Sequence, residues 1–206
     1  MEQFRGKYLV QDRSTKQIYE TPQMLYMMIA LTLFETSGKD EEGKVNWERM
    51  KWVKEFYDAI SQFYISLPTP IMAGVRTPTR QFSSCVLIES GDSLDSINAT
   101  ATSIVKYISK KAGIGIGAGS IRALGSRIGD GSVVHTGLIP FLKYFQSAVK
   151  SCSQGGVRGG AATVYLPIWH YEYEDLVVLK NNKGVDSNRV RHMDYAFQFN
   201  KLMYTR

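Results

Sequence analysis

The chain has 206 residues, of which 44% are hydrophobic and 21% are charged; this composition is typical of a globular protein and excludes disorder over most of the length. The length is enough for one domain with a real core, or for one and a half small domains. The formal net charge of +6 suits a phosphate-rich ligand, but the Lys and Arg residues are scattered along the sequence, which argues against a nucleic-acid binder.

The use of cysteine and histidine excludes several classes of protein. The chain has two cysteines, Cys85 and Cys152, and three histidines, so it offers neither a zinc-ligand spacing nor a disulfide framework. We therefore expect no metal site, no cofactor held by this chain alone, reduced thiols and a cytoplasmic location. The N-terminus has no apolar signal sequence, and the longest apolar stretch, near residues 24–34, is too short to span a bilayer, so we expect no membrane partner.

The first 66 residues are predicted to form a helical N-terminal region. Residues 1–20 are polar with a short apolar alternation, which indicates a lead-in or an edge strand. Thr21 and Pro22 then supply an N-cap and a first-turn proline for a helix. Its apolar stripe is predicted from residues at helical spacing, which are Met24, Met28 and Leu31.

A charged surface loop is expected at 38–43, and a second helix follows it. The apolar stripe of this helix is predicted to consist of Met50, Val53, Tyr57, Ile60 and Tyr64. The segment 67–70 contains two prolines, which end the helix.

From residue 67 onward, strands are predicted to alternate with helices. The expected strands lie at 81–88, at 113–119 (a buried strand or a turn) and at 162–166. The first expected helix is capped by Ser93 after an acidic turn, and its inward residues are Leu94, Ile97, Ala101, Ile104 and Ile108. The second is capped by Thr136 after a loop at 121–137, and its inward residues are Leu138, Leu142, Phe145 and Val149. A third helix is expected at 171–180. This alternation predicts an α/β architecture with a largely parallel sheet or barrel.

Two glycine-rich segments match no phosphate-binding motif. Residues 113–119 do not fit G-x-G-x-x-G, because Ser120 stands where the last glycine would be, and the motif G-x-x-x-x-G-K-[ST] does not occur in the sequence. For 113–119, the pattern favours close packing of the backbone against a neighbour. Residues 154–160 contain four glycines around Arg158, which fits a ligand-binding loop and a purely mobile connection equally well.

Several single residues have both a structural and a functional interpretation. Cys85, at a strand start, is either a small buried hydrophobe or a redox thiol, for which Cys152 is the second thiol that this sequence offers. Asp92 and Arg122 are either caps and surface charges, or groups that bind the hydroxyls and phosphates of a ligand. The basic cluster at 189–192 favours a solvated face, and the residue order does not support a Ser-His-Asp triad.

Six stretches together carry a resemblance to one enzyme family. They are residues 76–88, 91–97, 113–116, 121–126, 151–163 and 189–195. In this order they resemble the large, catalytic subunit of class I ribonucleoside-diphosphate reductase, in the form found in enteric bacteria and their phages. The resemblance covers nearly the whole chain and is dense from Leu67 onward.

The resemblance implies a fold and a catalytic role. The fold would be a helical N-terminal region at 1–66, followed at 67–206 by the first part of a ten-stranded α/β barrel that carries effector-binding loops. Cys85 matches the thiol that supplies reducing equivalents to the ribose and becomes half of a redox disulfide. The positions that match the surroundings of a nucleoside diphosphate substrate are Thr69, Ser84 and Gly113.

The resemblance also implies a regulatory site that binds a deoxynucleoside triphosphate or ATP as an allosteric effector. The matching positions are Asp92 at the effector sugar, Ile121, Arg122 and Arg127 in a first loop around the phosphates, and Gln154, Gly155 and Arg158 in a second loop between effector and substrate. A glycine-rich loop has several conformations of similar energy, from which a bound nucleotide can select one. Helices near 93–111 and 136–152 would pair in a homodimer that completes this site.

The sequence departs from the family pattern in several places. Gly117 and Ser120 stand where the family often has Asn and Arg, and the second basic residue of the first loop is Arg127 rather than a residue near Gly129. The family's Asn-x-Cys-x-Glu motif with the radical cysteine, its C-terminal cysteine pair and its N-terminal ATP-binding cone do not occur in this sequence.

The resemblance therefore implies part of an oxidoreductase that makes deoxyribonucleotides for DNA synthesis, incomplete and inactive as an isolated chain. Its implied partners are the remainder of the large subunit, a small subunit with a radical-generating metal centre, and thioredoxin or glutaredoxin. The alternative is a non-catalytic, effector-binding half of a split reductase that complements a separate polypeptide.

Overall fold

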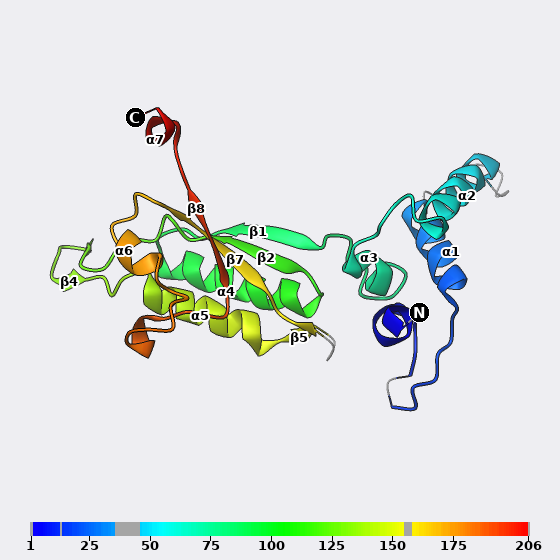
Figure 1. Cartoon of the computed structure of the whole chain (residues 1–206), viewed down its shortest axis with the longest axis horizontal. Helices are drawn as coiled ribbons and strands as arrows, with labels where there is room; N and C mark the ends of the chain where they lie inside the picture. The colour runs from blue at the N-terminus through cyan, green and yellow to red at the C-terminus, as the bar shows by residue number, and fades with distance from the viewer. Residues whose placement is uncertain (1, 13, 36–45, 155–157, 206) are drawn as a thin grey trace. The chain divides into compact units, whose positions relative to one another are not determined.

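The computed structural model describes residues 2–12, 14–35, 46–154 and 158–205. The chain divides into two compact units, Met1–Ser84 and Cys85–Arg206 (Figure 1). The change of character expected at residue 67 falls inside the first unit. The first unit is helical and the second alternates strands with helices, as the sequence patterns predict.

The first unit consists of η1 (Phe4–Tyr8), α1 (Pro22–Leu33), α2 (Trp47–Ser61) and α3 (Thr69–Gly74). The predicted start of α1 is confirmed, because the Thr21 hydroxyl accepts a hydrogen bond from Met24 N at 3.3 Å. Asn46 caps α2 in the same way, accepting from Arg49 N at 3.0 Å. The apolar core of this unit is formed by Leu9, Leu25, Tyr26, Ile29, Ile60, Met72 and Val75.

The apolar stripe predicted for α1 is wrong by one position. Met24 and Met28 are exposed, and the buried face is formed by Leu25 and Ile29 instead. The helix is apolar on most sides, so local spacing does not decide which stripe turns inward. Its packing against α2 and α3 makes that choice.

Two further expectations for the first unit are corrected. Residues 1–20 do not form an edge strand, because η1 and a single bridge between Gln11 and Ile18 take its place. Tyr64 is exposed, because α2 ends at Ser61, before the prolines that were expected to end it. The charged loop expected at 38–43 lies outside the described residues.

The second unit is built on a four-stranded sheet whose strands all run parallel, in the order β1-β2-β7-β8. The strands are β1 (Cys85–Glu89), β2 (Gly113–Gly117), β7 (Ala162–Pro167) and β8 (Asp194–Gln198). Helices α4 (Leu94–Ser109) and α5 (Ile139–Ser151) make the crossovers and cover the same face of the sheet (Figure 1). Helices on one face of a parallel sheet are typical of α/β barrels rather than of doubly wound folds.

Alternate residues of the strands point to opposite faces of the sheet. Those that face the helices form an apolar core with α4 and α5, and they include Val86, Ile88, Ile114, Ile116 and Val164. On the other face Leu87 is 78% exposed, beside a hollow of about 390 Å³ that Tyr165 also lines. A Cβ atom added at Gly115 would overlap the Leu87 side chain, so the predicted close packing of backbone at 113–119 is confirmed.

Several helix predictions for the second unit are confirmed. Ser93 caps α4, accepting from Ser96 N at 3.2 Å. The predicted inward residues of both helices are buried, except for Leu94, which is exposed; the buried ones are Ile97, Ala101, Ile104, Ile108, Leu138, Leu142, Phe145 and Val149. Leu94 is the first residue of α4, and the buried face of the helix begins at Ile97.

Other predictions for this unit are wrong. The strand expected at 81–88 begins at Cys85. Thr136 does not cap α5, because the N-cap position is Leu138, which makes no side-chain cap hydrogen bond. The helix expected at 171–180 is reduced to α6 (Tyr173–Leu176), and β8 was not expected, since its five residues are only partly buried and lack strict alternation.

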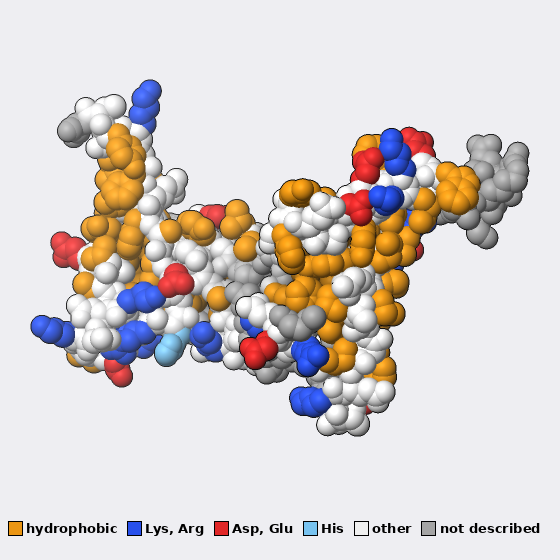
Figure 2. Space-filling view, turned by 45° about the vertical axis from the view of Figure 1, so that its right-hand side comes forward, with side chains coloured by type: hydrophobic (Ala, Val, Ile, Leu, Met, Phe, Trp, Pro, Cys, Tyr) orange, Lys and Arg blue, Asp and Glu red, His pale blue; other side chains and the backbone are white. Residues whose placement is uncertain are grey.

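The connections of the second unit add four two-residue strands and two short helical segments. They are β3 (Arg127–Ile128), β4 (Val133–Val134), β5 (Ser153–Gln154), β6 (Arg158–Gly159), η2 (Asp186–Asn188) and α7 (Lys201–Tyr204). Hydrophobic side chains remain on the surface of both units (Figure 2). Among the described helices, none combines the length and the apolar character that crossing a bilayer requires.

Candidate functional site

The amino-terminal edge of the sheet holds part of the candidate substrate site. Cys85 and Gly113 begin β1 and β2 and are paired in register, so the backbone of the candidate cysteine lies beside that of Gly113. The backbone N–H of Ile114 donates to the carbonyl of Ala161 at 3.1 Å, which brings the end of the second glycine-rich segment to the same edge. A thiol, a strand start and a glycine-rich connection therefore meet in one place.

The other candidate substrate residues lie in the first unit. Thr69 begins α3, and its hydroxyl is 3.5 Å from the Tyr8 hydroxyl. Ser84 is half-buried and directly precedes Cys85, whose side chain is exposed. The purely structural interpretation of Cys85 as a buried hydrophobe is therefore wrong. Cys152 is half-buried and packs against the core of the second unit.

The second glycine-rich segment forms a narrow hairpin, in which Gln154 of β5 pairs with Arg158 of β6. Gly155 and the side chains of Gln154 and Arg158 lie outside the described residues. Gly160 packs so closely against Val149 of α5 that a Cβ atom there would overlap the Val149 carbonyl oxygen. The hairpin therefore emerges at the carboxyl ends of α4 and α5.

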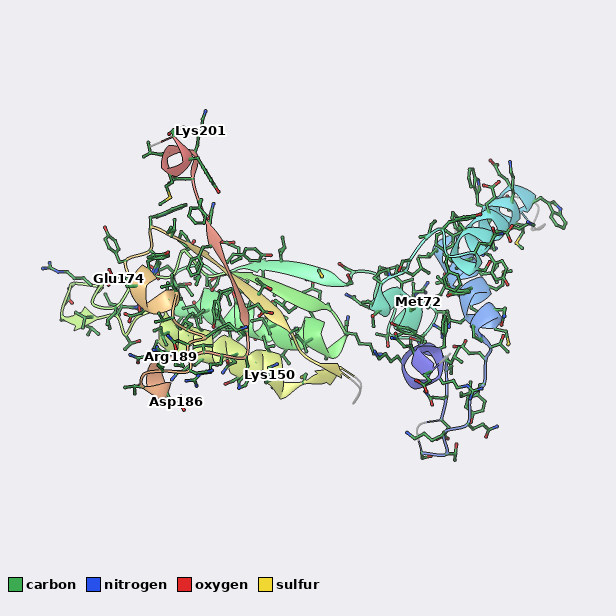
Figure 3. All side chains as sticks on the ribbon, viewed as in Figure 1. Met72, Lys150, Glu174, Asp186, Arg189 and Lys201 are labelled. Atoms are coloured by element: carbon green, nitrogen blue, oxygen red, sulfur yellow. The ribbon has the colours of Figure 1, made fainter. Side chains whose placement is uncertain are left out.

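Lys150, labelled in Figure 3, connects α5 to the base of this hairpin through a hydrogen bond. Its ammonium donates to the carbonyl of Gly160 at 3.1 Å. A Cβ atom at Gly160 would also press against Ile108, which belongs to the last turn of α4. The two glycine-rich segments thus approach each other at the start of β2 and β7.

The opposite, carboxyl edge of the sheet holds the candidate effector residues. Asp92 follows β1 and Arg122 follows β2, and their side chains form an ion pair with Nε and Oδ2 2.6 Å apart. The backbone N–H of Arg122 also donates to Asp92 Oδ1 at 2.8 Å. The Arg122 guanidinium donates through Nη1 to the carbonyl of Arg127 at 2.9 Å, and Ile121 is buried beneath it.

A groove of about 430 Å³ lies beside this ion pair. Its walls are Asp92, Ser93, Leu94, Ile97, Arg122, Ile128, Val133, Val134, His135, Thr136 and Phe141. One part of the groove is ionic and the rest is apolar, with His135 stacked on Phe141 at a centroid separation of 5.5 Å. A guanidinium, a carboxylate and apolar walls are the groups that a phosphate, sugar hydroxyls and a planar base would contact.

The groove and the hairpin stand at opposite ends of α4. Asp92 precedes the first residue of α4, and the hairpin base packs against Ile108 in its last turn. A helix of 16 residues is about 24 Å long. The structure therefore brings Asp92, Ile121, Arg122 and Arg127 together but does not bring them to the hairpin of the same chain.

Two residues at the carboxyl edge of the sheet were not predicted as site residues. Glu172 is buried and accepts hydrogen bonds from the backbone N–H groups of Leu124 and Leu138, at 3.0 and 2.9 Å. His170 lies 2.9 Å through Nε2 from the carbonyl of Ile121. The sequence signal for them was a His and a Glu in the segment after β7, where a helix was predicted instead.

The charged side chains of the basic cluster at 189–192 lie in contact with solvent, as expected, and the two arginines also close a connection of the chain. Arg189, labelled in Figure 3, donates through Nη2 to the carbonyl of Lys183 at 2.8 Å. Arg191 pairs with Asp186 at 2.7 Å, and this hydrogen bond lowers the pKa of that exposed carboxyl below its ordinary value. The arginines therefore have structural partners in the segment between α6 and β8.

Within the described ranges 2–12, 14–35, 46–154 and 158–205, His, Cys, Asp and Glu do not form any group of three that could hold a metal ion. Burial raises the pKa of the Tyr195 phenol, and the nearby Asp194 carboxylate adds to the rise. The Tyr195 hydroxyl donates to the carbonyl of Val190 at 2.7 Å, so this group is structural.

Curated relatives match the chain over nearly all of its length. The ribonucleoside-diphosphate reductase subunit alpha of Haemophilus influenzae is 67% identical over 206 residues, and the ribonucleoside-diphosphate reductase 1 subunit alpha of Escherichia coli is 66% identical over the same length. The subunit alpha of Enterobacteria phage T4 is 63% identical over 204 residues, which is 99% of this chain. The chain spans 26% of the length of each of these relatives.

Two family models also match the chain, and their limits follow the two units of the structure. Residues 1–80 match the model described as ribonucleotide reductase, all-alpha domain. Residues 83–206 match the model described as ribonucleotide reductase, barrel domain. The helical first unit and the one-sided parallel sheet of the second unit agree with these descriptions. The chain therefore belongs to the ribonucleotide reductase family, with an all-alpha domain followed by barrel-domain strands.

Proposed function

We propose that this chain contributes the reducing thiol and the allosteric nucleotide groove of a ribonucleoside-diphosphate reductase alpha subunit. The observation that carries the proposal is the separation of two groups of residues along α4. Cys85, Gly113 and the glycine-rich hairpin lie at the amino-terminal edge of the sheet, while Asp92 and Arg122 lie at its carboxyl edge. The proposed catalytic residues and the proposed effector residues would therefore lie at opposite edges of the four-stranded sheet.

The proposed chemistry at the first edge is reduction of a ribose carbon. Two thiols give two electrons: the C–OH bond breaks, a C–H bond forms, the hydroxyl leaves as water and the thiols become a disulfide. Cys85 is suited to this role because its side chain is exposed at the start of β1. The second thiol and the radical cysteine that starts the reaction would come from the remainder of the subunit, and Thr69 and Ser84 would contact the substrate.

The proposed effector is a deoxynucleoside triphosphate or ATP. Arg122 supplies a fixed cation for its phosphates, Asp92 supplies acceptors for its sugar hydroxyls, and apolar residues such as Val133 and Val134 line the space for its base. Asp92 and Arg122 bind each other, so a nucleotide must share or replace their ion pair. Arg127 contributes its carbonyl to Arg122, while Ile121 anchors the loop in the core.

A second copy of the chain would bring the hairpin to the groove. A nucleotide held by Arg122 is shorter than the roughly 24 Å length of α4, so it cannot touch the hairpin of its own chain. A two-fold axis that pairs α4 and α5 with the same helices of a partner would place the groove of one copy by the hairpin of the other. The exposed side of this helix pair suits such contact, since it carries Leu94, Asn98, Thr102, Tyr107 and Tyr144.

The proposed partners follow from the parts that this chain does not supply. They are the remainder of the alpha subunit, a small subunit whose metal centre generates the radical, and thioredoxin or glutaredoxin to restore the thiols. A chain that binds effector and complements a separate polypeptide would use the same groove and the same dimer. The groove is therefore the feature to test first.

The test is equilibrium binding of dTTP to the chain, compared with Asp92→Ala. We expect the variant to bind about tenfold or more weakly, because a charge-assisted hydrogen bond contributes roughly 1.5–3 kcal/mol. Sedimentation of the chain with and without dTTP is expected to show dimers that the nucleotide favours.

Asp95→Ala is the matched control, since Asp95 is an exposed carboxylate in the first turn of α4 that does not line the groove. It is expected to bind dTTP like the unmodified chain. Equal affinity of the unmodified chain and Asp92→Ala would show that the groove is not the effector site.

A further inference from the structure

Glu172 joins both ends of the loop that forms one wall of the groove. The loop runs from Ile121 to Leu138, and the Glu172 Oε2 atom accepts from Leu124 N near its beginning and from Leu138 N at its end, at 3.0 and 2.9 Å. The residue is only 8% exposed, so these hydrogen bonds are shielded from water. One carboxylate oxygen therefore closes the loop at its base.

The fit between Glu172 and the loop is close. Gly137 has a φ of +92°, and a Cβ atom there would lie 2.7 Å from Glu172 Oε1. The sequence beside α5 supplies no side-chain cap, and the Glu172 carboxylate lies at this helix start, where the helix dipole favours negative charge. The Glu172 carboxylate therefore holds the start of α5, which the Thr136 hydroxyl was predicted to cap.

His170 holds the neighbouring peptide. Its Nδ1 accepts from the backbone N–H of Glu172 at 3.2 Å, so the neutral ring carries its proton on Nε2 and donates to the carbonyl of Ile121 at 2.9 Å. That carbonyl belongs to the same peptide group as the N–H of Arg122, which donates to Asp92 at 2.8 Å. The Ile121–Arg122 peptide is therefore held from both sides, by His170 and by Asp92.

We propose that His170 and Glu172 are positioning residues for the effector groove, which set the direction of Arg122 before nucleotide arrives. The inference rests on the proposed function of the groove. The loop contains four glycines with positive φ, at 125, 129, 131 and 137, and ordering such a segment is costly. Fixing the base of the loop removes part of that cost from binding.

The first test measures backbone amide hydrogen exchange by NMR in His170→Ala and Glu172→Ala. Exchange is expected to accelerate about tenfold or more at Arg122, Leu124 and Leu138, where a hydrogen bond or its support is lost. The amides of Ile114 and Ile116 in β2 serve as an internal reference and are expected to keep their rates. Equal acceleration in β2 would mean general destabilisation and would overturn the proposal.

Conservative variants distinguish a positioning role of His170 and Glu172 from a general contribution of these residues to stability. In His170→Gln the side-chain amide can still donate to Ile121 O, and in Glu172→Gln the carbonyl oxygen can still accept, so both are expected to restore slow exchange at Arg122 in part. Glu174→Gln is the matched control: Glu174 is exposed on α6, two residues away (Figure 3), and its variant is expected to behave like the unmodified chain.

The second test is dTTP affinity in the same set. Glu172→Ala and His170→Ala are expected to lose about fivefold to fiftyfold, with smaller losses in the Gln variants and none in Glu174→Gln. Unchanged affinity in both Ala variants would overturn the proposal. If the unmodified chain itself does not bind dTTP, the proposed function fails, and exchange at Arg122 alone decides whether His170 and Glu172 position the loop.

Discussion

The two units of this chain use charged side chains in different ways. In the first unit, a buried ion pair between Arg76 and Glu20 stands among the helices, with side chains only 3% and 10% exposed. In the second unit, the sheet core is apolar, and the paired charges of Asp92 and Arg122 lie at the edge, partly exposed. The difference follows from how each unit brings its segments together.

Strands in register join distant segments through the backbone, whereas irregular segments need side chains to do so. Arg76 connects three segments of the first unit, because it donates to Met72 O at 2.7 Å, to Tyr8 O at 3.0 Å and to the Glu20 carboxylate. Glu20 in turn accepts from Val10 N at 2.7 Å. In the second unit β1, β2, β7 and β8 need no such connection, so its polar side chains are available at the sheet edges.

The largest expected effect is in the first unit. Arg76→Met is expected to lower the free energy of unfolding by about 3–5 kcal/mol, because it leaves a buried carboxylate and two carbonyls without their donor. Urea unfolding with peptide-level hydrogen exchange would measure this loss and show whether residues 2–35 lose protection while β1 and β2 keep theirs.

A surface ion pair of the same unit provides the control for that experiment. Arg80 pairs with Glu35 at 2.7 Å, and both side chains are more than half exposed. Arg80→Met is expected to cost less than about 1 kcal/mol. Similar losses in the two variants would remove the contrast between a buried and an exposed pair.

A smaller effect is expected from backbone packing in the second unit. Gly160→Ala places a Cβ atom against the Val149 carbonyl and the Ile108 side chain, and the carbonyl cannot move without disturbing α5. We expect a loss of about 1–3 kcal/mol in the free energy of unfolding. Gly159→Ala, where nothing lies within 4 Å of the added atom, is expected to stay within about 0.5 kcal/mol in the same urea titration.

The smallest effect concerns pH and is confined to the second unit. Because burial raises the pKa of Tyr195 above its ordinary value of 10.0, the unfolded chain releases this proton first as pH rises. The stabilisation is complete below about pH 10 and is lost above it, by less than about 1.4 kcal/mol per pH unit, since the phenol keeps some solvent contact. In Tyr195→Phe, unfolding midpoints measured between pH 8 and 11 are expected to fall less steeply; parallel curves would contradict this assignment.

Features that depend only on neighbouring residues follow the sequence predictions. Thr21 and Ser93 cap their helices as expected, since a cap requires only a hydroxyl and the following turn. Where two local solutions compete, the prediction is wrong, as for the stripe that Met24 and Met28 were expected to form on α1. The cap predicted at Thr136 is also wrong, because the group that holds the start of α5 comes from the segment after β7.

For the candidate site, the positions of residues beside strand ends follow from the strand order, whereas the contacts that hold them do not. Asp92 and Arg122 follow β1 and β2, and parallel strands bring their carboxyl ends to one edge, so their meeting follows from the strand order. The roles of Cys85, Thr69, Asp92, Arg122 and the hairpin residues remain predictions. Their test lies in the dTTP titration and in assays with the rest of the subunit.

By itself, the sequence determined the order of α1, α2, β1, α4, β2, α5 and β7, most of the inward residues of α4 and α5, and the family, because these depend on local periodicity and on runs of matching residues. The tertiary structure alone decided which face of α1 is buried, that the groove and the hairpin occupy opposite ends of α4, and that Glu172 closes a loop 34 residues away from Leu138 along the chain. The physical reason is that a hydrogen bond between distant residues depends on how the core packs, and such a bond leaves no periodic pattern in the residues beside it.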